Sequence, residues 1–312
     1  MGALIVAIVL VSVIFAAVFL LMYGLYRYAF CLSLRKRPDV RRIPDSRLYR
    51  DYRQTMLEVV EEMDQTPYET VSIPSQDGLL LCGRLYSIKE DAPMIIFFHG
   101  YHGTAAWDGY GFFRICRENG INILMADERA HGKSEGSVIT LGIMERCDCK
   151  SWSEYVAERF GENTDIFLAG VSMGAASVIM SSELDLPRNV RALIADCGYS
   201  RPATILMETV KSMKLPVKPI YFFLKHGARL FGHFDLEGCT ALEAVEKLNI
   251  PILFIHGAQD SIVPSFMGEE LYNACTGRKA WTLIEKADHA NSAMTDYEAY
   301  KKSVLHFIGQ SL

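Results

Sequence analysis

The sequence predicts an α/β protein with one mostly parallel sheet of eight strands and helices on both faces of the sheet. One membrane-spanning helix is predicted at its N-terminus. From residue 54 onward, short apolar runs alternate with longer helical patterns, which is typical of a parallel sheet covered on both sides. The first 22 residues are nearly all apolar. A chain of 312 residues, half of them hydrophobic and 22% charged, suffices for one large domain and is not disordered.

The N-terminal run from Ala3 to Met22 contains a single polar residue, Ser12. As a helix it is about 30 Å long, which matches the hydrocarbon thickness of a bilayer. Aromatic and basic residues follow it, as at a membrane interface: Tyr23, Tyr26, Arg27 and Tyr28. The uncharged start disfavours the alternative, a cleaved signal peptide. We therefore expect a transmembrane anchor over residues 1–26.

Residues 27–53 form a basic neck between the anchor and the main domain. They hold nine Lys and Arg against three Asp, which leaves 23 basic and 34 acidic residues from position 54 onward. Because positive charge flanks the span only on its C-terminal side, we expect the main domain on the cytoplasmic side of a cell membrane. The eight scattered cysteines show no disulfide pattern, in agreement with this location. The acidic main domain argues against nucleic-acid binding.

The main domain, residues 54–312, is expected to contain eight strands and at least five helices. The predicted strands are 68–73, 79–86, 94–98, 122–126, 165–171, 190–196, 250–256 and 280–285. The predicted helices are 107–118, 145–159, 173–183, 266–276 and 296–309. A turn-type sequence, Ser75-Gln76-Asp77-Gly78, separates the first two strands and predicts an antiparallel hairpin.

More than fifty residues separate the sixth and seventh strands, too many for an ordinary connection. Residues 198–234 are expected to form an inserted pair of helices, broken near Pro216 and Pro219. Cations are interleaved with apolar side chains in this segment: Lys211, Lys214, Lys218, Lys225 and Arg229. This mixture predicts a lid over an apolar acyl pocket, with a rim that faces anionic lipid. The candidate substrate contacts are Met207, Met213, Phe222 and Phe223. The alternative is that these apolar side chains are ordinary core.

A G-x-S-x-G pattern lies where the fifth strand ends and a helix of small residues begins, with Ser172 between Gly170 and Gly174. A sharp turn at this point projects the serine hydroxyl, and the flanking glycines avoid side-chain collisions. We predict that Ser172 is a nucleophile. The alternatives are a pseudoenzyme or a tight structural turn.

A serine nucleophile requires a base, and the base requires an acceptor that orients it. Asp260 follows the seventh strand and His289 follows the eighth, so both are expected at the same sheet edge as Ser172. We predict Asp260 as the acid and His289 as the base. Asp196, at the end of the sixth strand, is the alternative acid. His306 falls in the predicted last helix and is not expected in the site.

An oxyanion hole requires two backbone N–H groups that point at the carbonyl oxygen of the substrate. We expect one from Met173, beside the nucleophile. The other is expected from Tyr101, in the glycine-containing turn after the third strand.

The segment Asp127 to Gly136, with the sequence DERAHGKSEG, resembles the D-x-R-x-H-G-x-S turn of the α/β-hydrolase superfamily. Together with the G-x-S-x-G pattern and the chain order Ser, Asp, His, it makes residues 65–312 resemble this superfamily. With its N-terminal span, the whole chain resembles membrane-anchored bacterial hydrolases of the serine aminopeptidase-like and acyl-esterase-like branches. The resemblance implies an α/β-hydrolase fold and hydrolysis of esters, lipids, thioesters or peptides through an acyl-enzyme.

The other histidines are expected to be structural rather than catalytic. His99 and His131 each precede a glycine in a turn at a strand end, and His256 ends a strand. His102 is the exception, since it is a candidate to face the substrate. No cluster of His, Cys, Asp or Glu has the spacing of a metal site, so no metal and no cofactor is predicted.

These patterns predict a membrane-anchored serine hydrolase that cleaves carboxylic esters, with an acyl lipid or similar small apolar ester as substrate. A peptidase or aminopeptidase with the same catalytic residues is the first alternative. It would require an acidic subsite for a free amine, which no feature of the sequence supplies. A non-catalytic membrane scaffold is the second alternative, and the complete set of Ser172, Asp260 and His289 argues against it.

Overall fold

The computed structural model describes residues 2–32, 40, 43 and 45–312. Five of the nine basic residues of the predicted neck lie outside the described residues: Arg35, Lys36, Arg37, Arg41 and Arg42.

In the described part of the chain, eight strands form one sheet in the order β1-β2-β4-β3-β5-β6-β7-β8. The strands are β1 Glu69–Pro74, β2 Leu80–Tyr86, β3 Met94–Phe98, β4 Asn122–Ala126, β5 Ile166–Val171, β6 Val190–Asp196, β7 Ile252–Gly257 and β8 Lys279–Ile284. β1 and β2 form the expected antiparallel hairpin, and β2 also pairs antiparallel with β4. The other pairs are parallel. The sheet is therefore mostly parallel, as the sequence predicts.

Alternate residues of the central strands face opposite layers of helices. In β3, Ile96 and Phe98 belong to one buried cluster, whereas Ile95 and Phe97 belong to the other. The first layer contains α5 Glu145–Phe160, α6 Met173–Ser181, α9 Ala241–Glu246 and α10 Ser265–Ala274. The second contains α2 Arg53–Gln65, α4 Tyr110–Asn119 and α12 Tyr297–Ser311. This period of two explains why the strands read as continuous apolar runs.

Several helices of the structure differ from the sequence prediction. The expected helix 107–118 is divided into α3 Ala105–Asp108 and α4. The division falls at Gly109, where a Cβ would stand only 2.7 Å from the Phe97 ring. No helix was predicted at the start of the main domain, where α2 packs Met56 and Val60 against Trp107. The short helices η2 Arg50–Tyr52 and α11 Ser292–Thr295 were likewise not predicted.

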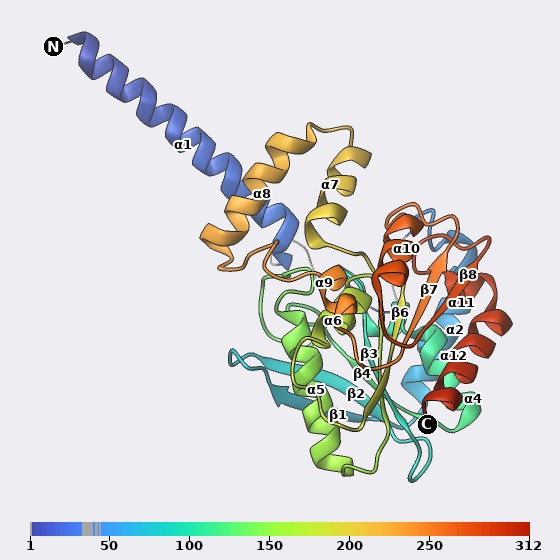
Figure 1. Cartoon of the computed structure of the whole chain (residues 1–312). Helices are drawn as coiled ribbons and strands as arrows, with labels where there is room; N and C mark the ends of the chain where they lie inside the picture. The colour runs from blue at the N-terminus through green and yellow to red at the C-terminus, as the bar shows by residue number, and fades with distance from the viewer. Residues whose placement is uncertain (1, 33–39, 41–42, 44) are drawn as a thin grey trace.

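The insertion after β6 contains two helices, α7 Pro202–Ser212 and α8 Val217–Phe231. Pro216 directly precedes α8, and Pro219 lies in its first turn, where a missing N–H costs no helical hydrogen bond. Figure 1 shows that these helices stand above the carboxyl edge of the sheet, next to α1. The predicted pair of inserted helices is thus present.

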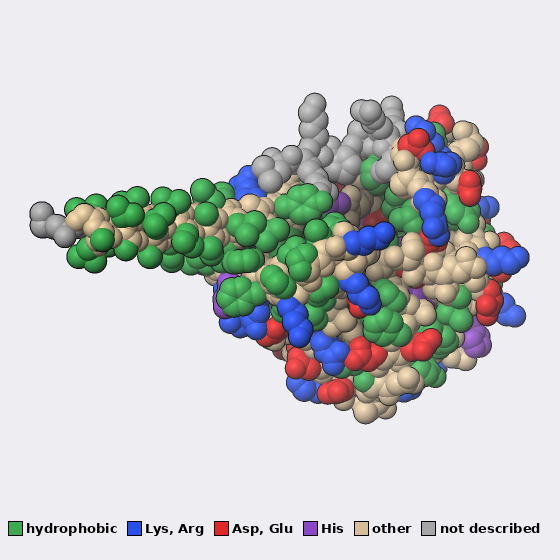
Figure 2. All heavy atoms as spheres, turned by 90° about the horizontal axis from the view of Figure 1, so that it is seen from above, with side chains coloured by type: hydrophobic (Ala, Val, Ile, Leu, Met, Phe, Trp, Pro, Cys, Tyr) green, Lys and Arg blue, Asp and Glu red, His purple; other side chains and the backbone are tan. Residues whose placement is uncertain are grey.

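The N-terminal helix α1, Gly2–Phe30, projects from the domain and ends beside α8 (Figure 1). It continues past the predicted anchor boundary at residue 26 into the neck. Hydrophobic side chains cover its projecting part on the visible face (Figure 2). Within the described residues it is the one helix long and apolar enough to cross a membrane, a test that a signal sequence would also pass.

Candidate active site

Ser172 lies in a sharp turn between β5 and α6. Its backbone has φ of 55° and ψ of −113°, a conformation that L-residues rarely adopt and that aims the hydroxyl away from the sheet. Gly174 makes this turn possible, because a Cβ there would lie 2.8 Å from the His99 carbonyl oxygen. Only 9% of the Ser172 surface is exposed.

A chain of hydrogen bonds joins the three residues predicted as nucleophile, base and acid. Ser172 Oγ lies 3.0 Å from His289 Nε2, and His289 Nδ1 lies 2.8 Å from Asp260 Oδ2. The other oxygen of Asp260, Oδ1, accepts the amides of Ile262 and Val263 at 2.9 and 2.7 Å. The structure thus brings together residues that are far apart in the sequence.

The charges around Ser172, His289 and Asp260 favour a basic imidazole at His289. Burial lowers the pKa of His289, but the charge and hydrogen bond of Asp260 outweigh burial, so the pKa lies above its usual value. Burial raises the pKa of Asp260, but His289 and His256 hold it well below its usual range. Asp260 is therefore ionised at neutral pH and stabilises a protonated His289.

The turn after β3 is held next to Ser172 by several hydrogen bonds. Asp108 Oδ2 accepts the Gly100 amide at 2.8 Å, and a Cβ on Gly100 would stand 3.3 Å from Ser172 Cβ. The Gly103 amide donates to the Gly100 carbonyl, and the His102 amide donates to His131 Nε2. The amides of Gly100, His102 and Gly103 therefore have protein acceptors. Asp108, whose pKa burial raises to about 6, was not predicted from the sequence, since nothing marks it apart from other acidic residues.

The turn after β4 supports the turn after β3. His131 Nδ1 bonds the Arg129 carbonyl, which leaves Nε2 to accept from His102. His99 Nδ1 bonds the Gly100 carbonyl, while its Nε2 accepts the Glu128 amide at 3.1 Å. Both histidines organise turns, in agreement with the sequence analysis.

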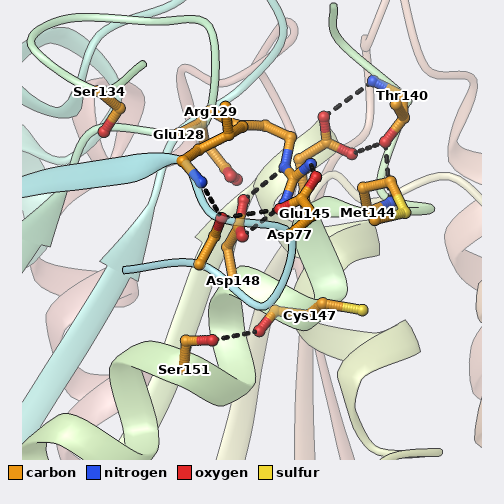
Figure 3. A network of polar contacts seen from close by, with 12 residues as sticks. Asp77, Glu128, Arg129, Ser134, Thr140, Met144, Glu145, Cys147, Asp148 and Ser151 are labelled. Carbon is orange, nitrogen blue, oxygen red and sulfur yellow. Dashed lines mark hydrogen bonds and ion pairs between the residues drawn. The ribbon is translucent and has the colours of Figure 1, made fainter. Parts of the chain in front are cut away.

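Arg129 anchors this second turn in a buried network that Figure 3 shows. Its guanidinium donates to both oxygens of Asp148 at 2.7 Å and to both oxygens of Asp77 at 2.9 and 3.1 Å. In the same region Glu145 accepts the amides of Thr140 and Gly142. Breaking such a buried pair on one side typically costs about 3 to 5 kcal/mol. The network thus fixes the turn that carries His131.

An apolar cavity of about 310 Å³ opens beside Ser172, which forms part of its wall. Side chains of α7, α8 and the turn between them line it: Ile205, Leu206, Thr209, Val210, Met213, Leu215, Ile220 and Leu224. Tyr101, Leu141, Tyr199, Ile262 and Val263 contribute from the main domain. Leu25, Tyr28 and Ala29 of α1 complete the wall, a contribution that the sequence analysis did not foresee. The described lining contains no Asp or Glu.

The predicted lid contacts divide in two. Met213 lines the cavity, whereas Met207, Phe222 and Phe223 do not, and this corrects the expectation for these three residues. For Phe222 the reason is helical phase: α8 turns Ile220 and Leu224 inward, so that Phe222 points outward and is 56% exposed.

The alternative acid, Asp196, has other partners. It lies buried at the end of β6, where Ser292 Oγ donates to it at 3.2 Å. His256 Nε2 bonds the Val263 carbonyl at 2.9 Å and so supports the loop that carries Asp260. His306 lies on α12 beside Gln310. His102, with φ of 56°, meets the Tyr101 ring edge to face, and it is not among the residues that line the cavity.

Cys197 is a neighbour of the hydrogen-bonded chain that the sequence analysis missed. Its sulfur and the ligand atoms of Asp260 and His289 all lie within 4.8 Å of one another. Burial, with the charges of Asp196 and Asp260, keeps the pKa of this thiol far above its usual value, so Cys197 remains protonated. Cys197 would have to lose this proton to bind a metal ion, because the thiolate is the form that ligates metals. All eight cysteines are free.

Two protein-family models match the chain. The model described as serine aminopeptidase, S33, matches residues 89–222, and the model described as serine hydrolase (FSH1) matches residues 169–290. Ser172 lies within both matches.

Curated relatives and solved structures agree with these models. The chain is 27% identical to the uncharacterized protein YqkD of Bacillus subtilis over 81% of this chain and 82% of that protein. It is 26% identical to the lysophosphatidylserine lipase ABHD12 of Danio rerio, over 62% of this chain and 50% of that protein. The structure of the Pyrococcus furiosus esterase Pf2001 superposes with a TM-score of 0.65 at 23% identity, covering 88% of this chain and 98% of the esterase. Est1E of Butyrivibrio proteoclasticus, with ferulic acid bound, superposes with a TM-score of 0.60 at 21% identity, covering 77% and 99%.

The sheet order, the turn at Ser172 and these similarities define an α/β-hydrolase fold with a helical insertion. The two family models, each over less than half of the chain, support a serine hydrolase of the α/β-hydrolase superfamily.

Proposed function

We propose that this serine hydrolase cleaves carboxylic esters of apolar acyl groups, including lipid-like esters, through an acyl-enzyme. The observation that carries the proposal is the position of Ser172, which is hydrogen-bonded to His289 and also forms part of the wall of an apolar cavity. An acyl chain in that cavity would bring its ester carbonyl next to the nucleophile.

In the proposed mechanism, His289 Nε2 takes the proton of Ser172 Oγ as the oxygen attacks the ester carbonyl. Asp260, bonded to Nδ1, orients the imidazole and stabilises its protonated form. The protonated His289 then donates its proton to the departing alcohol, which leaves an acyl-serine. Water then attacks this acyl group while His289 accepts one of its protons. As the bond between the acyl carbon and Ser172 Oγ breaks, His289 returns that proton to Oγ, and a carboxylic acid is released.

The oxyanion of each tetrahedral intermediate would be held by the backbone amides of Met173 and Tyr101. Met173 begins α6, so its amide lies at a helix N-terminus, where negative charge is favoured. Tyr101 lines the same cavity as Ser172. Losing one such donor typically lowers kcat about 100- to 1000-fold.

The anchor and the domain boundaries belong to the same proposal. α1 would cross the cell membrane once, residues 27–53 would form the juxtamembrane neck, and the catalytic domain would be cytoplasmic, with the lid over about 198–234. The apolar run from Ala3 to Met22 and the basic residues that follow it support this orientation.

A peptidase is the competing function, and the family model described as serine aminopeptidase favours it. The cavity argues against it, because an aminopeptidase requires a negative subsite for a free amine and the described lining has no carboxylate. The name of one relative, a lysophosphatidylserine lipase, supports an acyl lipid instead.

The test is a comparison of p-nitrophenyl acyl esters of increasing chain length with aminoacyl anilides, using the full-length enzyme in detergent. We expect ester hydrolysis that becomes more efficient as the acyl chain grows and fills the cavity. Faster cleavage of the anilides than of every ester would overturn the proposal. Ser172→Ala is the control for non-enzymatic hydrolysis.

A further inference from the structure

The base of α1 is packed into the catalytic domain rather than joined to it by a free linker. Tyr26 and Phe30 are buried, and Phe30 meets Phe234 edge to face at 5.3 Å between ring centroids. The Tyr26 hydroxyl donates to the Phe231 carbonyl. Gly227 allows α8 to approach closely, because a Cβ there would lie 3.0 Å from Tyr26 Cβ. The anchor helix therefore has a defined position relative to the active site.

The same end of α1 forms part of the cavity beside Ser172. Leu25, Tyr28 and Ala29 stand in its wall together with Ile220 and Leu224 of α8. The Tyr101 hydroxyl donates to the Ala29 carbonyl at 2.8 Å, so α1 also contacts the turn proposed to bind the oxyanion.

The distance along α1 locates the cavity relative to a bilayer. If the hydrocarbon region ends near Met22, Leu25 and Ala29 lie three and seven residues beyond it. At the helical rise of 1.5 Å per residue this is about 5 to 10 Å, within the headgroup layer.

The position of α8 agrees with this depth independently. Phe231 of α8 packs edge to face on Phe19 and Tyr23, with ring centroids 5.2 and 5.1 Å apart, and Phe19 belongs to the apolar run itself. Figure 1 shows α8 crossing α1 rather than running along it. If α1 crosses the bilayer, a helix that crosses it at this level would lie at the membrane interface, and Phe222 and Leu230 of this helix are exposed.

We propose that α1 is a structural part of the active site as well as an anchor: it forms one wall of the acyl pocket and sets the pocket mouth at the bilayer surface. The substrate is then a membrane-resident ester with one apolar chain, which enters the pocket from the leaflet next to the catalytic domain. This inference rests on the proposed ester hydrolase function.

The cavity and its rim support this class of substrate. The volume of about 310 Å³ lies at the small end of ligand sites and suits one chain. Exposed apolar residues at the cavity come from three elements, namely Tyr28 of α1, Met213 and Leu215 of the α7–α8 turn, and Ile262 of the loop after β7. An acyl chain that moves from the bilayer into this pocket remains in apolar surroundings throughout. A water-soluble ester reaches the pocket from water and does not use this route.

The test uses the full-length enzyme in lipid vesicles with two α1 substitutions of opposite effect. Ala29→Phe should fill the pocket and lower kcat/KM for palmitoyl esters about tenfold or more, with butyryl esters changed less than about threefold. Leu25→Ala should enlarge the pocket and move the preferred acyl chain to a greater length. Ala17→Phe, in the exposed part of α1, is the matched control and should change neither.

Two further measurements separate the possible failures. Labelling of each variant with a fluorophosphonate should match the wild-type extent, which shows an intact nucleophile; a wild-type protein that does not label would refute the hydrolase function itself. If labelling is intact, equal effects of Ala29→Phe on long and short acyl chains would overturn the assignment of α1 to the pocket wall.

The rate on monoacylglycerol should follow its mole fraction in the vesicle. A rate that follows bulk concentration instead would indicate a soluble ester and overturn entry from the bilayer.

Discussion

The carboxyl edge of the sheet and the assembly of α1, α7 and α8 are built in different ways. At the sheet edge, Ser172 and His289 are at least nine-tenths buried, and the polar atoms of Ser172, His289 and Asp260 are joined by directed hydrogen bonds. The helical assembly instead contributes mostly apolar side chains, many of them half-exposed, such as Met213 and Leu215. The first region holds reacting groups in one geometry, and the second offers a surface of adjustable shape. Reaction type should therefore depend on the sheet edge, and substrate choice on the helices.

The largest expected effect is the loss of the base at the sheet edge. His289→Ala should lower kcat about 10⁴-fold or more on every ester, with little change in chain-length preference, because the pocket is untouched. Steady-state rates over a series of acyl chains measure both quantities. His306→Ala, on the surface of α12, is the matched control and should stay within about twofold of wild type. If His289→Ala retained the wild-type kcat but changed the preferred acyl-chain length, the proposed division of roles between the sheet edge and the helical assembly would be wrong.

Asp108 should be a positioning residue, since its carboxylate accepts the Gly100 amide and fixes the turn that carries Tyr101. Asp108→Ala should lower kcat about 10- to 100-fold with a smaller change in KM, because the turn loses its defined place. Asp108→Asn keeps an acceptor oxygen and should recover most of the rate. If alanine and asparagine behave alike, the hydrogen bond does not position the turn.

The pH dependence tests the charges at the sheet edge. His289 must be neutral to accept a proton, and Asp260 raises its pKa above the ordinary value. The rate, as kcat/KM, should therefore rise with pH along an acid limb whose midpoint lies above about 6.5, falling about tenfold per unit below it. Asp108→Asn removes a second charge that raises this pKa, so its limb should move to lower pH. A wild-type midpoint below 6.5 would contradict the assignment.

The smallest expected effect concerns two lysines of the helical assembly. Lys225 and Arg229 pair with Glu237 and Asp235, whereas Lys214 and Lys218 have no acidic partner within 4 Å among the described residues. Replacing both with Gln should lower kcat/KM on anionic vesicles about two- to fivefold and leave neutral vesicles unchanged.

A double Lys→Gln change at Lys89 and Lys302, which are exposed but belong to neither α7 nor α8, is the matched control. Equal losses on anionic and neutral vesicles would exclude an electrostatic contact with the membrane.

The sheet edge was largely predictable from sequence because its signals are local. Each of Ser172, Asp260 and His289 follows a strand that reads as a short apolar run, and parallel strands end at one edge. Three strands, β3, β4 and β6, have the predicted limits, and the limits of the others differ by one or two residues. At β7 the start shifts from 250 to 252, next to Pro251, which lacks the N–H that a strand interior requires.

The helical assembly was predictable in outline only. Its two helices follow from composition and the prolines, but the inward face of α8 depends on where α1 contacts it. Phe222 and Phe223 were predicted as substrate contacts because they are aromatic residues of the insertion, whereas the inward positions are Ile220 and Leu224. The aromatic residues after Met22 were interpreted as an interfacial belt, and only the tertiary contacts of Tyr26 and Tyr28 reveal a second use.

The most direct measurement for the central claim, that Ser172 activated by His289 is the nucleophile, is intact mass after treatment with a fluorophosphonate. We predict one phosphonyl adduct on the wild-type enzyme, mapped to Ser172 by peptide sequencing, no adduct on Ser172→Ala, and slow labelling of His289→Ala. An adduct that persists on folded Ser172→Ala, or a folded wild-type enzyme that gains no mass, would contradict the account.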